Sequence, residues 1–239
     1  CDWYVEFAKQ RFNNKETNNR QISEKVLIKV LNDILVMIHP FMPHITEELW
    51  HVLQLKSDKE LLSLQKWPTQ ENKFVDNKLD NSFQQLFEII RLIRNLRAEL
   101  GLKPSEKVPV YLISDNDELI DFLKILVDDI QTLTKSSEVF IFKTNAVDKK
   151  EFAKSFSGII SDLEVYLPFQ DFVNIDALKE RLNKDLKKVT IELDNLNKRL
   201  SNKNFVDKAP KDIVDECRFK LNEGSVQMER ITKKLELLN

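Results

Sequence analysis

The chain has 239 residues, of which 42% are hydrophobic and 32% are charged, and only three are glycine. This length exceeds one typical domain, and the composition favours a helical protein of two or three units. The formal net charge of −2 does not by itself indicate a nucleic-acid partner, and no apolar run is long enough to span a bilayer, which argues against an integral membrane protein.

The cysteines predict the cellular compartment of the protein, and the first residues indicate whether the sequence is a fragment. Cys1 and Cys217 do not form a disulfide framework and no signal peptide is present, so we expect a reducing cytoplasm. The chain opens on Cys1 without an initiator methionine and already in helical rhythm. We therefore expect a fragment of a longer protein.

Residues 1–107 are predicted to form a helix bundle. The first helix covers residues 2–12, with Trp3 and Phe7 facing inward, and a polar break over residues 13–19 precedes the second. The second helix has a wide apolar face, made of Ile22, Val26, Leu27, Val30, Leu31, Ile34, Leu35 and Ile38. A face this wide is typical of a helix in a bundle interior.

The next segment, HPFMPHITEELW, predicts a sharp corner followed by a short helix. Pro40 and Pro43 prevent helix continuation, and a helix can begin at Pro43. His39, His44 and His51 suggest a metal site, but no cysteine or paired carboxylates complete a recognised ligand spacing. We therefore favour corner and helix-end roles for these histidines and expect no metal.

The fourth predicted helix of the bundle covers residues 77–100. Its buried face is expected to consist of Phe83, Leu86, Phe87, Ile90, Ile93, Leu96 and Leu100. Arg91, Arg94, Asn95 and Arg97 are interleaved with this face, and the three arginines are spread over too broad an arc to pair with the few acids nearby. An anion-binding face and a set of solvated or internally paired arginines both remain open. Gly101 is predicted to end the helix.

Residues 108–174 are predicted to form a small α+β connecting module. Short runs rich in β-branched and aromatic residues predict strands at 108–113, 139–142, 156–160 and 163–167. A helix over residues 118–133 lies between the first two strands and is expected to cover one face of the sheet. No Gly-rich phosphate loop, nucleophile–base pair or Cys/His cluster occurs here, so we expect a packing spacer.

Residues 175–239 are predicted to form two long helices, each with one narrow apolar stripe. The stripes are Ile175, Leu178, Leu182, Leu186, Val189, Leu193, Leu196 and Leu200, then Ile213, Cys217, Leu221, Gly224, Met228, Ile231, Leu235 and Leu238. The two helices are expected to bury these stripes against each other as an antiparallel coiled coil. A doubled step of four in each stripe predicts a locally relaxed supercoil, and Gly224 predicts a thinly packed point.

The turn between these helices and the charge of the hairpin complete the prediction. Residues 201–212 form the turn, with Pro210 in the first turn of the second helix and Phe205 and Val206 covering the tip. Residues 176–239 hold 15 Lys or Arg against 12 Asp or Glu, a net charge of +3 that a merely solvated face would also carry. The predicted fold is mainly α: a helix bundle, a small α+β module, and a C-terminal antiparallel two-helix coiled-coil hairpin.

Several stretches resemble a known family. CDWYVEFAK at residues 1–9, HPFMPHITEELW at 39–50 and RLIRNLRAE at 91–99 resemble the anticodon-binding bundle of class I aminoacyl-tRNA synthetases. LEVYLP at 163–168 and LSNKNFVDKAP at 200–210 are similar to the C-terminal arm of the valyl-tRNA synthetase family. The isoleucine branch often ends in a zinc-binding segment, and this chain lacks the cysteines for one.

The resemblance covers essentially the whole chain and implies a function. The bundle would read the anticodon of tRNA(Val), and the arm would contact the outer corner of that tRNA, where the D and T loops meet. The catalytic and editing domains of the enzyme, which attaches valine to tRNA(Val) with ATP, would precede Cys1, because neither ATP-site signature of the family occurs here. The fragment alone would then be inactive and hold no cofactor, while the full-length enzyme would use ATP and Mg²⁺.

The expected partners and contact residues follow from the same resemblance. We expect a cytoplasmic monomer that binds tRNA(Val) and neither DNA nor a membrane. The expected tRNA contacts are Arg91, Arg94, Asn95 and Arg97 in the bundle, and Arg181, Lys184, Lys188, Lys198, Arg199, Lys203, Lys208, Lys211 and Arg218 in the arm. Two alternatives remain: another synthetase of the same subgroup, and a scaffolding protein whose hairpin is a dimerisation coiled coil with incidental positive charge.

Overall fold

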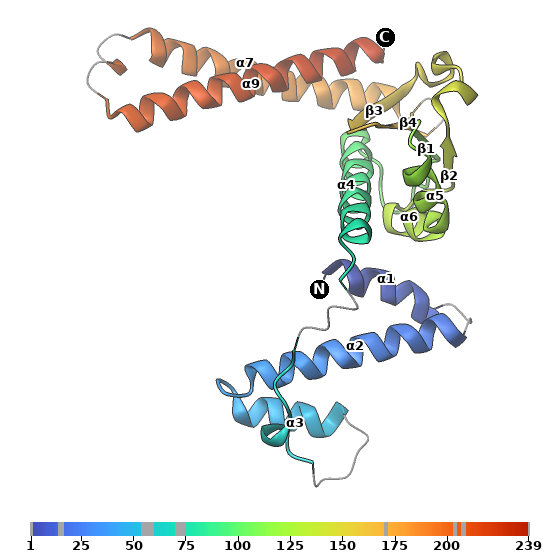
Figure 1. Cartoon of the computed structure of the whole chain (residues 1–239). Coiled ribbons are helices and arrows are strands. Elements are labelled where there is room, and N and C mark those ends of the chain that lie inside the picture. Colours follow the sequence, from blue (N-terminus) through green and yellow to red (C-terminus); the bar gives the residue numbers. More distant parts are fainter. Residues whose placement is uncertain are drawn as a thin grey trace. The chain divides into compact units, whose positions relative to one another are not determined.

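The computed structural model describes residues 2–13, 17–53, 60–69, 75–169, 172–202, 205–206 and 209–238. It confirms the predicted fold class, which is mainly α with a small sheet and a C-terminal helical hairpin. The chain divides into two compact units, Cys1–Asn81 and Ser82–Asn239, whose elements are labelled in Figure 1. Among the described helices, no segment combines the length and the apolarity needed to cross a bilayer.

In its described residues, the first unit has three α-helices and one short 3₁₀ helix before the fourth α-helix begins. These are α1 (Asp2–Asn13), α2 (Thr17–Ile38), α3 (Pro43–Leu53) and η1 (Leu62–Leu64). The predicted corner lies between α2 and α3, and Pro43 begins α3, as expected. Leu35, Trp50 and Leu62 are buried together and hold α2, α3 and η1 in one core.

The second unit begins within the fourth helix, α4 (Asn77–Leu100). The sequence assigns this helix to the bundle, yet from Ser82 onward it belongs to the unit that contains the sheet and the hairpin. Its buried residues are Leu86, Ile89, Ile90, Ile93, Leu96, Arg97 and Leu100. Gly158 shows how closely α4 approaches the sheet, because a Cβ at this position would lie 2.6 Å from Leu92 Cδ1.

Four strands form one mixed sheet in the order β2-β1-β4-β3. They are β1 (Val110–Ile113), β2 (Val139–Phe142), β3 (Ser155–Ile160) and β4 (Leu163–Pro168). Strands β1 and β2 are parallel, whereas β4 is antiparallel to both β1 and β3. All four lie within two residues of their predicted positions.

The connection between β1 and β2 differs from the prediction of one helix over residues 118–133. It contains two helices, α5 (Asp117–Ile125) and α6 (Val127–Thr134), which are separated at Leu126 with φ −109° and ψ 16°. Asn116 caps α5 by accepting a hydrogen bond from the Leu119 amide at 3.1 Å. Two 3₁₀ turns, η3 (Thr144–Ala146) and η4 (Lys149–Phe152), connect β2 to β3.

The two faces of the sheet have different side chains. One face is mostly buried and mainly aliphatic, with Leu112, Leu163 and Val165 each at most 1% exposed. The other face carries a half-buried row of aromatic rings, in which Tyr111 stacks on Phe140 with ring centroids 5.0 Å apart. Such alternation is what a strand with one core-facing side produces.

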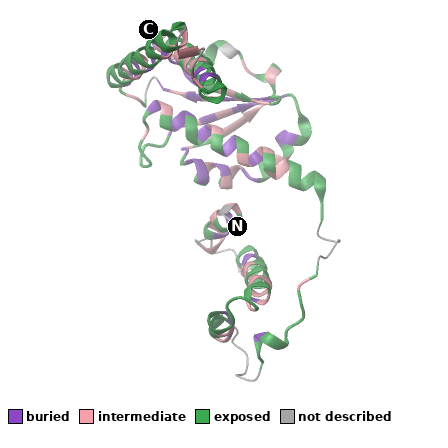
Figure 2. Cartoon of the chain, turned by 90° about the vertical axis from the view of Figure 1, so that its left-hand side faces the viewer, coloured by how far each residue is buried: buried purple, intermediate pink, exposed green. Residues whose placement is uncertain are grey.

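The last two helices, α7 (Ile175–Ser201) and α9 (Lys211–Leu237), lie side by side as the predicted hairpin (Figure 1). Asn174 caps α7 by accepting a hydrogen bond from the Ala177 amide at 3.0 Å. Figure 2 shows that the hairpin is largely exposed outside its seam, whereas buried residues gather in the sheet and the helices next to it. The hairpin therefore offers most of its surface to a partner.

The seam of α9 begins one residue later than predicted. Val214 is 5% exposed and lies in the seam, whereas Ile213 is 46% exposed and lies outside it. From Val214 the stripe continues through Cys217 in alternating steps of three and four, so the doubled step on which the relaxed supercoil of this helix was predicted does not occur. The doubled step of four remains only in α7.

Gly224 lets the two helices approach each other. A Cβ at this position would lie 2.8 Å from Leu193 Cδ2, so the Leu193 side chain occupies the space that the glycine leaves. A groove of about 460 Å³ opens beside this contact.

Candidate nucleic-acid interface

The exposed face of α4 carries three of the four bundle residues that are expected to contact tRNA. Arg91, Arg94 and Asn95 are exposed and lie three and four residues apart, which places them on one side of the helix. Arg94 also donates from Nε to the carbonyl of Leu133 at 3.0 Å, so its guanidinium is held towards the end of α6. Two guanidinium groups and an amide thus share one accessible surface.

Arg97 does not belong to this surface. It is 6% exposed, and its Nη2 donates to the carbonyls of Glu106 at 2.7 Å and Lys103 at 3.3 Å. Burial lowers the pKa of its guanidinium, an effect that the charge of Glu106 partly opposes. Arg97 therefore fixes the loop after α4 from inside, and the expectation that it contacts tRNA is replaced by this internal role.

Several expected contacts on the flanks of the hairpin are paired within their own helix. Lys184 lies 2.7 Å from Glu180, and Arg218 lies 3.2 Å from Asp215. The hydrogen bond to Glu180 and the charge of that carboxylate raise the pKa of Lys184. Lys188 is more loosely placed, 3.8 Å from Asp185. These cations face solvent, but each has a neighbouring acid that offsets its charge.

Arg181 is also directed away from the role expected of it. Its Nη2 donates to the backbone carbonyl of Glu99, at the end of α4, and lies 3.5 Å from the carbonyl of Ala98. This side chain therefore contacts another helix of the same unit. The sequence pattern did not distinguish it from the cations that face solvent.

The remaining expected contacts gather at the distal end of the hairpin. Lys198, Arg199 and Lys211 are exposed and form no salt bridge with any residue that the structure describes. Lys203 and Lys208, also expected to contact tRNA, lie outside the described residues. This end of the arm is therefore the part in which cations are least neutralised by their neighbours.

The charge distribution along the arm agrees with this placement. Residues 195–211 hold five Lys or Arg against one Asp, a net charge of +4. Residues 176–194 and 212–239 together hold 10 Lys or Arg against 11 Asp or Glu, a net charge of −1. The positive excess of the whole arm is thus confined to its tip, the arrangement expected where one end of a long element meets phosphates.

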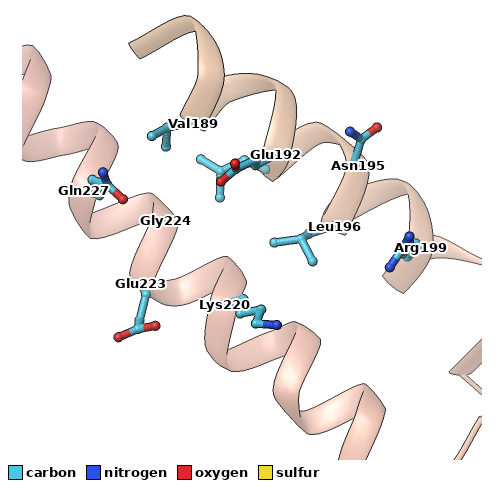
Figure 3. Close-up of a pocket in the computed structure, with 10 residues that line it drawn as sticks. Val189, Glu192, Asn195, Leu196, Arg199, Lys220, Glu223, Gly224 and Gln227 are labelled. Atoms are coloured by element: carbon cyan, nitrogen blue, oxygen red, sulfur yellow. The ribbon is translucent and has the colours of Figure 1, made fainter. Parts of the chain in front are cut away.

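The groove beside Gly224 does not extend this positive surface. Arg199 and Lys220 line this groove together with Glu192 and Glu223 (Figure 3). Lys220 is already paired with Glu216 at 2.6 Å. Its lining of both signs makes the groove a poor anion site.

Two of the three histidines make side-chain contacts at the corner and within α3. His39 Nδ1 lies 2.8 Å from the hydroxyl of Thr46, and His51 Nε2 lies 3.3 Å from Glu47. The Glu47 carboxylate also accepts a hydrogen bond from the Leu62 amide at 2.9 Å, which ties α3 to η1. Within the described ranges, no group of three or more His, Cys, Asp or Glu side chains is arranged to hold a metal ion.

Comparison with protein families gives two matches along the chain. Residues 1–112 match the family described as the anticodon-binding domain of tRNA ligase. Residues 174–239 match the family described as the valyl tRNA synthetase tRNA binding arm. Together the two matches include α4 and both helices of the hairpin.

Individual relatives are similar over the whole chain. A valine–tRNA ligase of Prochlorococcus marinus subsp. pastoris is 71% identical over 238 residues, and those of Synechocystis and Thermotoga maritima are 36% and 34% identical. The alignments cover 99–100% of this chain but only 26% of each relative. The chain thus spans about a quarter of the length of the proteins it matches.

Proposed function

This chain belongs to the valine–tRNA ligase family, and on that premise we propose that it is the tRNA-recognising part of an enzyme that attaches valine to tRNA(Val). The observation that carries this proposal is the separation of two accessible cationic surfaces, one on α4 and one at the tip of the hairpin. One tRNA can contact both surfaces, because its anticodon loop and its outer corner are separate parts of one folded molecule.

The surface on α4 would read the anticodon. Arg91, Arg94 and Asn95 combine planar guanidinium groups, which bind phosphate and stack on splayed bases, with an amide that hydrogen-bonds base edges. Single-stranded loop bases are the usual targets of sequence-specific RNA recognition. Arg97 is left out of this proposal because it is buried.

The tip of the arm would contact phosphates at the tRNA corner. Lys198, Arg199 and Lys211, with the charges of Lys203 and Lys208, would position the RNA without reading its sequence. The flanking cations Lys184, Lys188 and Arg218 are secondary candidates, since each must give up an acidic neighbour to bind phosphate.

The remaining properties follow from the family. Activation of valine with ATP and Mg²⁺ would reside in the three quarters of the relatives that this chain does not match. We place the enzyme in the cytoplasm as a monomer, with tRNA(Val) as its nucleic-acid partner and neither DNA nor a membrane as a partner. The seam residues Leu178, Val189 and Ile231 are buried within one hairpin, so a second copy is not needed to cover them.

Two measurements test the proposal. In the full-length enzyme, Arg91→Ala and Arg94→Ala should each weaken transition-state stabilisation for charging tRNA(Val) by about 1–3 kcal/mol and reduce discrimination against a changed anticodon. The 239-residue chain by itself should bind tRNA(Val) but support no valine-dependent ATP–pyrophosphate exchange. Unchanged charging by both variants would remove α4 from the interface, and self-association of the chain without tRNA binding would favour the scaffolding alternative.

A further inference from the structure

The arm is joined to α4 by more than the connecting chain. Helix α4 ends at a left-handed glycine, Gly101, with φ 74°. The Gly101 amide donates to the carbonyl of Ala98, and the Leu102 amide donates to that of Arg97, both at 3.0 Å. This is a Schellman ending, which leaves the carbonyl of Glu99 available to a donor from elsewhere.

Arg181, in the second turn of α7, is that donor. Its Nη2 bonds to the Glu99 carbonyl and places a positive charge at the negative end of the α4 dipole. Gly101 makes room for the guanidinium, because a Cβ there would lie 2.6 Å from Arg181 Nη1. The left-handed backbone of Gly101 ends α4, and its lack of a side chain leaves space for Arg181 to reach the Glu99 carbonyl.

A second connection comes from the other helix of the arm. Lys234 of α9 lies with its Nζ 2.7 Å from Glu99 Oε2, and the same ammonium is 5.6 Å from the centre of the Phe156 ring on β3. Lys234 keeps 23% of its side-chain surface exposed, against 69% for its neighbour Lys233. Both helices of the arm are therefore tied to one residue, Glu99, through its carbonyl and its carboxylate.

We propose that Arg181 and Lys234 are positioning residues that fix the direction of the arm relative to α4. This inference rests on the proposed function: with the direction fixed, the α4 surface and the arm tip meet one tRNA as a preorganised pair of contacts. A second contact made within a rigid body adds affinity, because little orientational freedom remains to be lost. The two side chains act through geometry and need not touch RNA.

The first test measures the direction of the arm without RNA. Fluorophores are placed by bio-orthogonal chemistry at Gln84 on α4 and Ile191 on α7 of the full-length enzyme, and single-molecule energy transfer is recorded. The double variant Arg181→Met/Lys234→Met keeps the aliphatic stems but removes the charges and donors, and should broaden the transfer distribution. Lys184→Met and Lys233→Met, which remove neighbouring cations paired within their own helices, should leave it unchanged. A distribution that stays narrow in the double variant overturns the inference.

The second test measures affinity for tRNA(Val) in two backgrounds. In the parent enzyme the double variant should weaken binding about tenfold, because the two contacts no longer act as one. In a tip-neutralised enzyme (Lys198, Arg199, Lys208 and Lys211 to Gln) it should have no further effect. An equal loss in both backgrounds would mean that Arg181 or Lys234 binds RNA directly, which overturns the positioning role. If the tip-neutralised enzyme binds as well as the parent, the proposed role of the arm in binding tRNA fails, while the energy-transfer result still decides the inference.

Discussion

At the scale of single residues, α4 shows that one side-chain type serves two purposes within two turns. Arg91 and Arg94 are exposed, whereas Arg97 is 6% exposed and donates to two carbonyls of the following loop. The two carbonyls satisfy Arg97 Nη2, whereas Arg97 Nη1 is buried without a hydrogen-bond partner among the described residues, so this guanidinium is committed to the interior at a cost. Stability and binding should therefore respond to different arginines of the same helix.

Replacing Arg97 should destabilise the fold. Arg97→Met leaves the carbonyls of Lys103 and Glu106 without this donor and should lower the free energy of unfolding by about 1–3 kcal/mol. Arg91→Met, at the surface, should change it by less than about 0.5 kcal/mol. Urea unfolding of both variants at neutral pH makes the comparison, and equal losses would contradict the division between the two arginines.

Tyr166 gives a pH-dependent prediction. Its hydroxyl donates to Glu164 Oε2 at 2.6 Å, and burial together with this hydrogen bond raises its pKa from 10.0 to about 12. The folded state therefore holds the phenolic proton more tightly than the unfolded state does. The stabilisation is fully present below pH 10 and is lost as the pH rises from about 10 to about 12.

The Tyr166→Phe variant should show a smaller loss of stability between pH 10 and pH 12 than the parent protein. Thermal unfolding across this range measures the difference. Tyr111→Phe, on the same face of the sheet, is the control for the removal of one hydroxyl. A parent and a Tyr166→Phe variant with parallel pH profiles would show that Tyr166 does not carry the effect.

At the scale of elements, hydrophobic periodicity in the sequence is sufficient to predict the positions of most helices and strands. The four strands and the two hairpin helices follow local patterns in which each apolar residue has one obvious face. The start of the α9 seam was predicted wrongly because Ile213 and Val214 are adjacent, apolar and β-branched, so either residue fits the apolar repeat as its first position. Only packing against α7 distinguishes them. The break at Leu126 gave no signal either, since no glycine or proline marks it.

The pair of adjacent residues at the start of α9 tests the corrected seam. Val214→Ala removes two buried methyl groups, worth about 1.6 kcal/mol at roughly 0.8 kcal/mol each, and regains about 0.5 kcal/mol of helix propensity. The net loss of stability should be about 1 kcal/mol. Ile213→Ala gains a similar propensity while losing little buried surface, so it should be neutral or slightly stabilising. The reverse order of effects in urea unfolding would restore the seam predicted from the sequence.

At the scale of the whole molecule, sequence reasoning named candidate contacts by charge and could not see which charges were already engaged. Arg181 and Glu99 are 82 residues apart, and no local pattern links them. Lys234 was not among the expected site residues, and its only signal is its position next to Leu235 on the flank of the seam. Among the expected arm contacts that the structure describes, Lys198, Arg199 and Lys211 at the tip are exposed and form no salt bridge, in a stretch where the sequence has five cations and one acid.

This division of the arm into a neutral shaft and a positive tip gives the last prediction. Each phosphate contact releases counterions, so the logarithm of affinity falls with the logarithm of salt by about 0.7–0.9 per phosphate. If two to four tip cations contact phosphates, the tip-neutralised enzyme should show a slope reduced by about 1.5–3.5.

A matched variant replaces four flanking lysines by Gln (Lys184, Lys188, Lys220 and Lys233) and has the same net charge as the tip-neutralised enzyme. It should change the slope by less than about 1, because each of these lysines is already paired with an acid. Measuring tRNA(Val) affinity across a salt series for the parent and both variants separates local contact from overall charge. Equal slopes in the two variants would mean that net charge alone attracts the tRNA and that the tip has no special role.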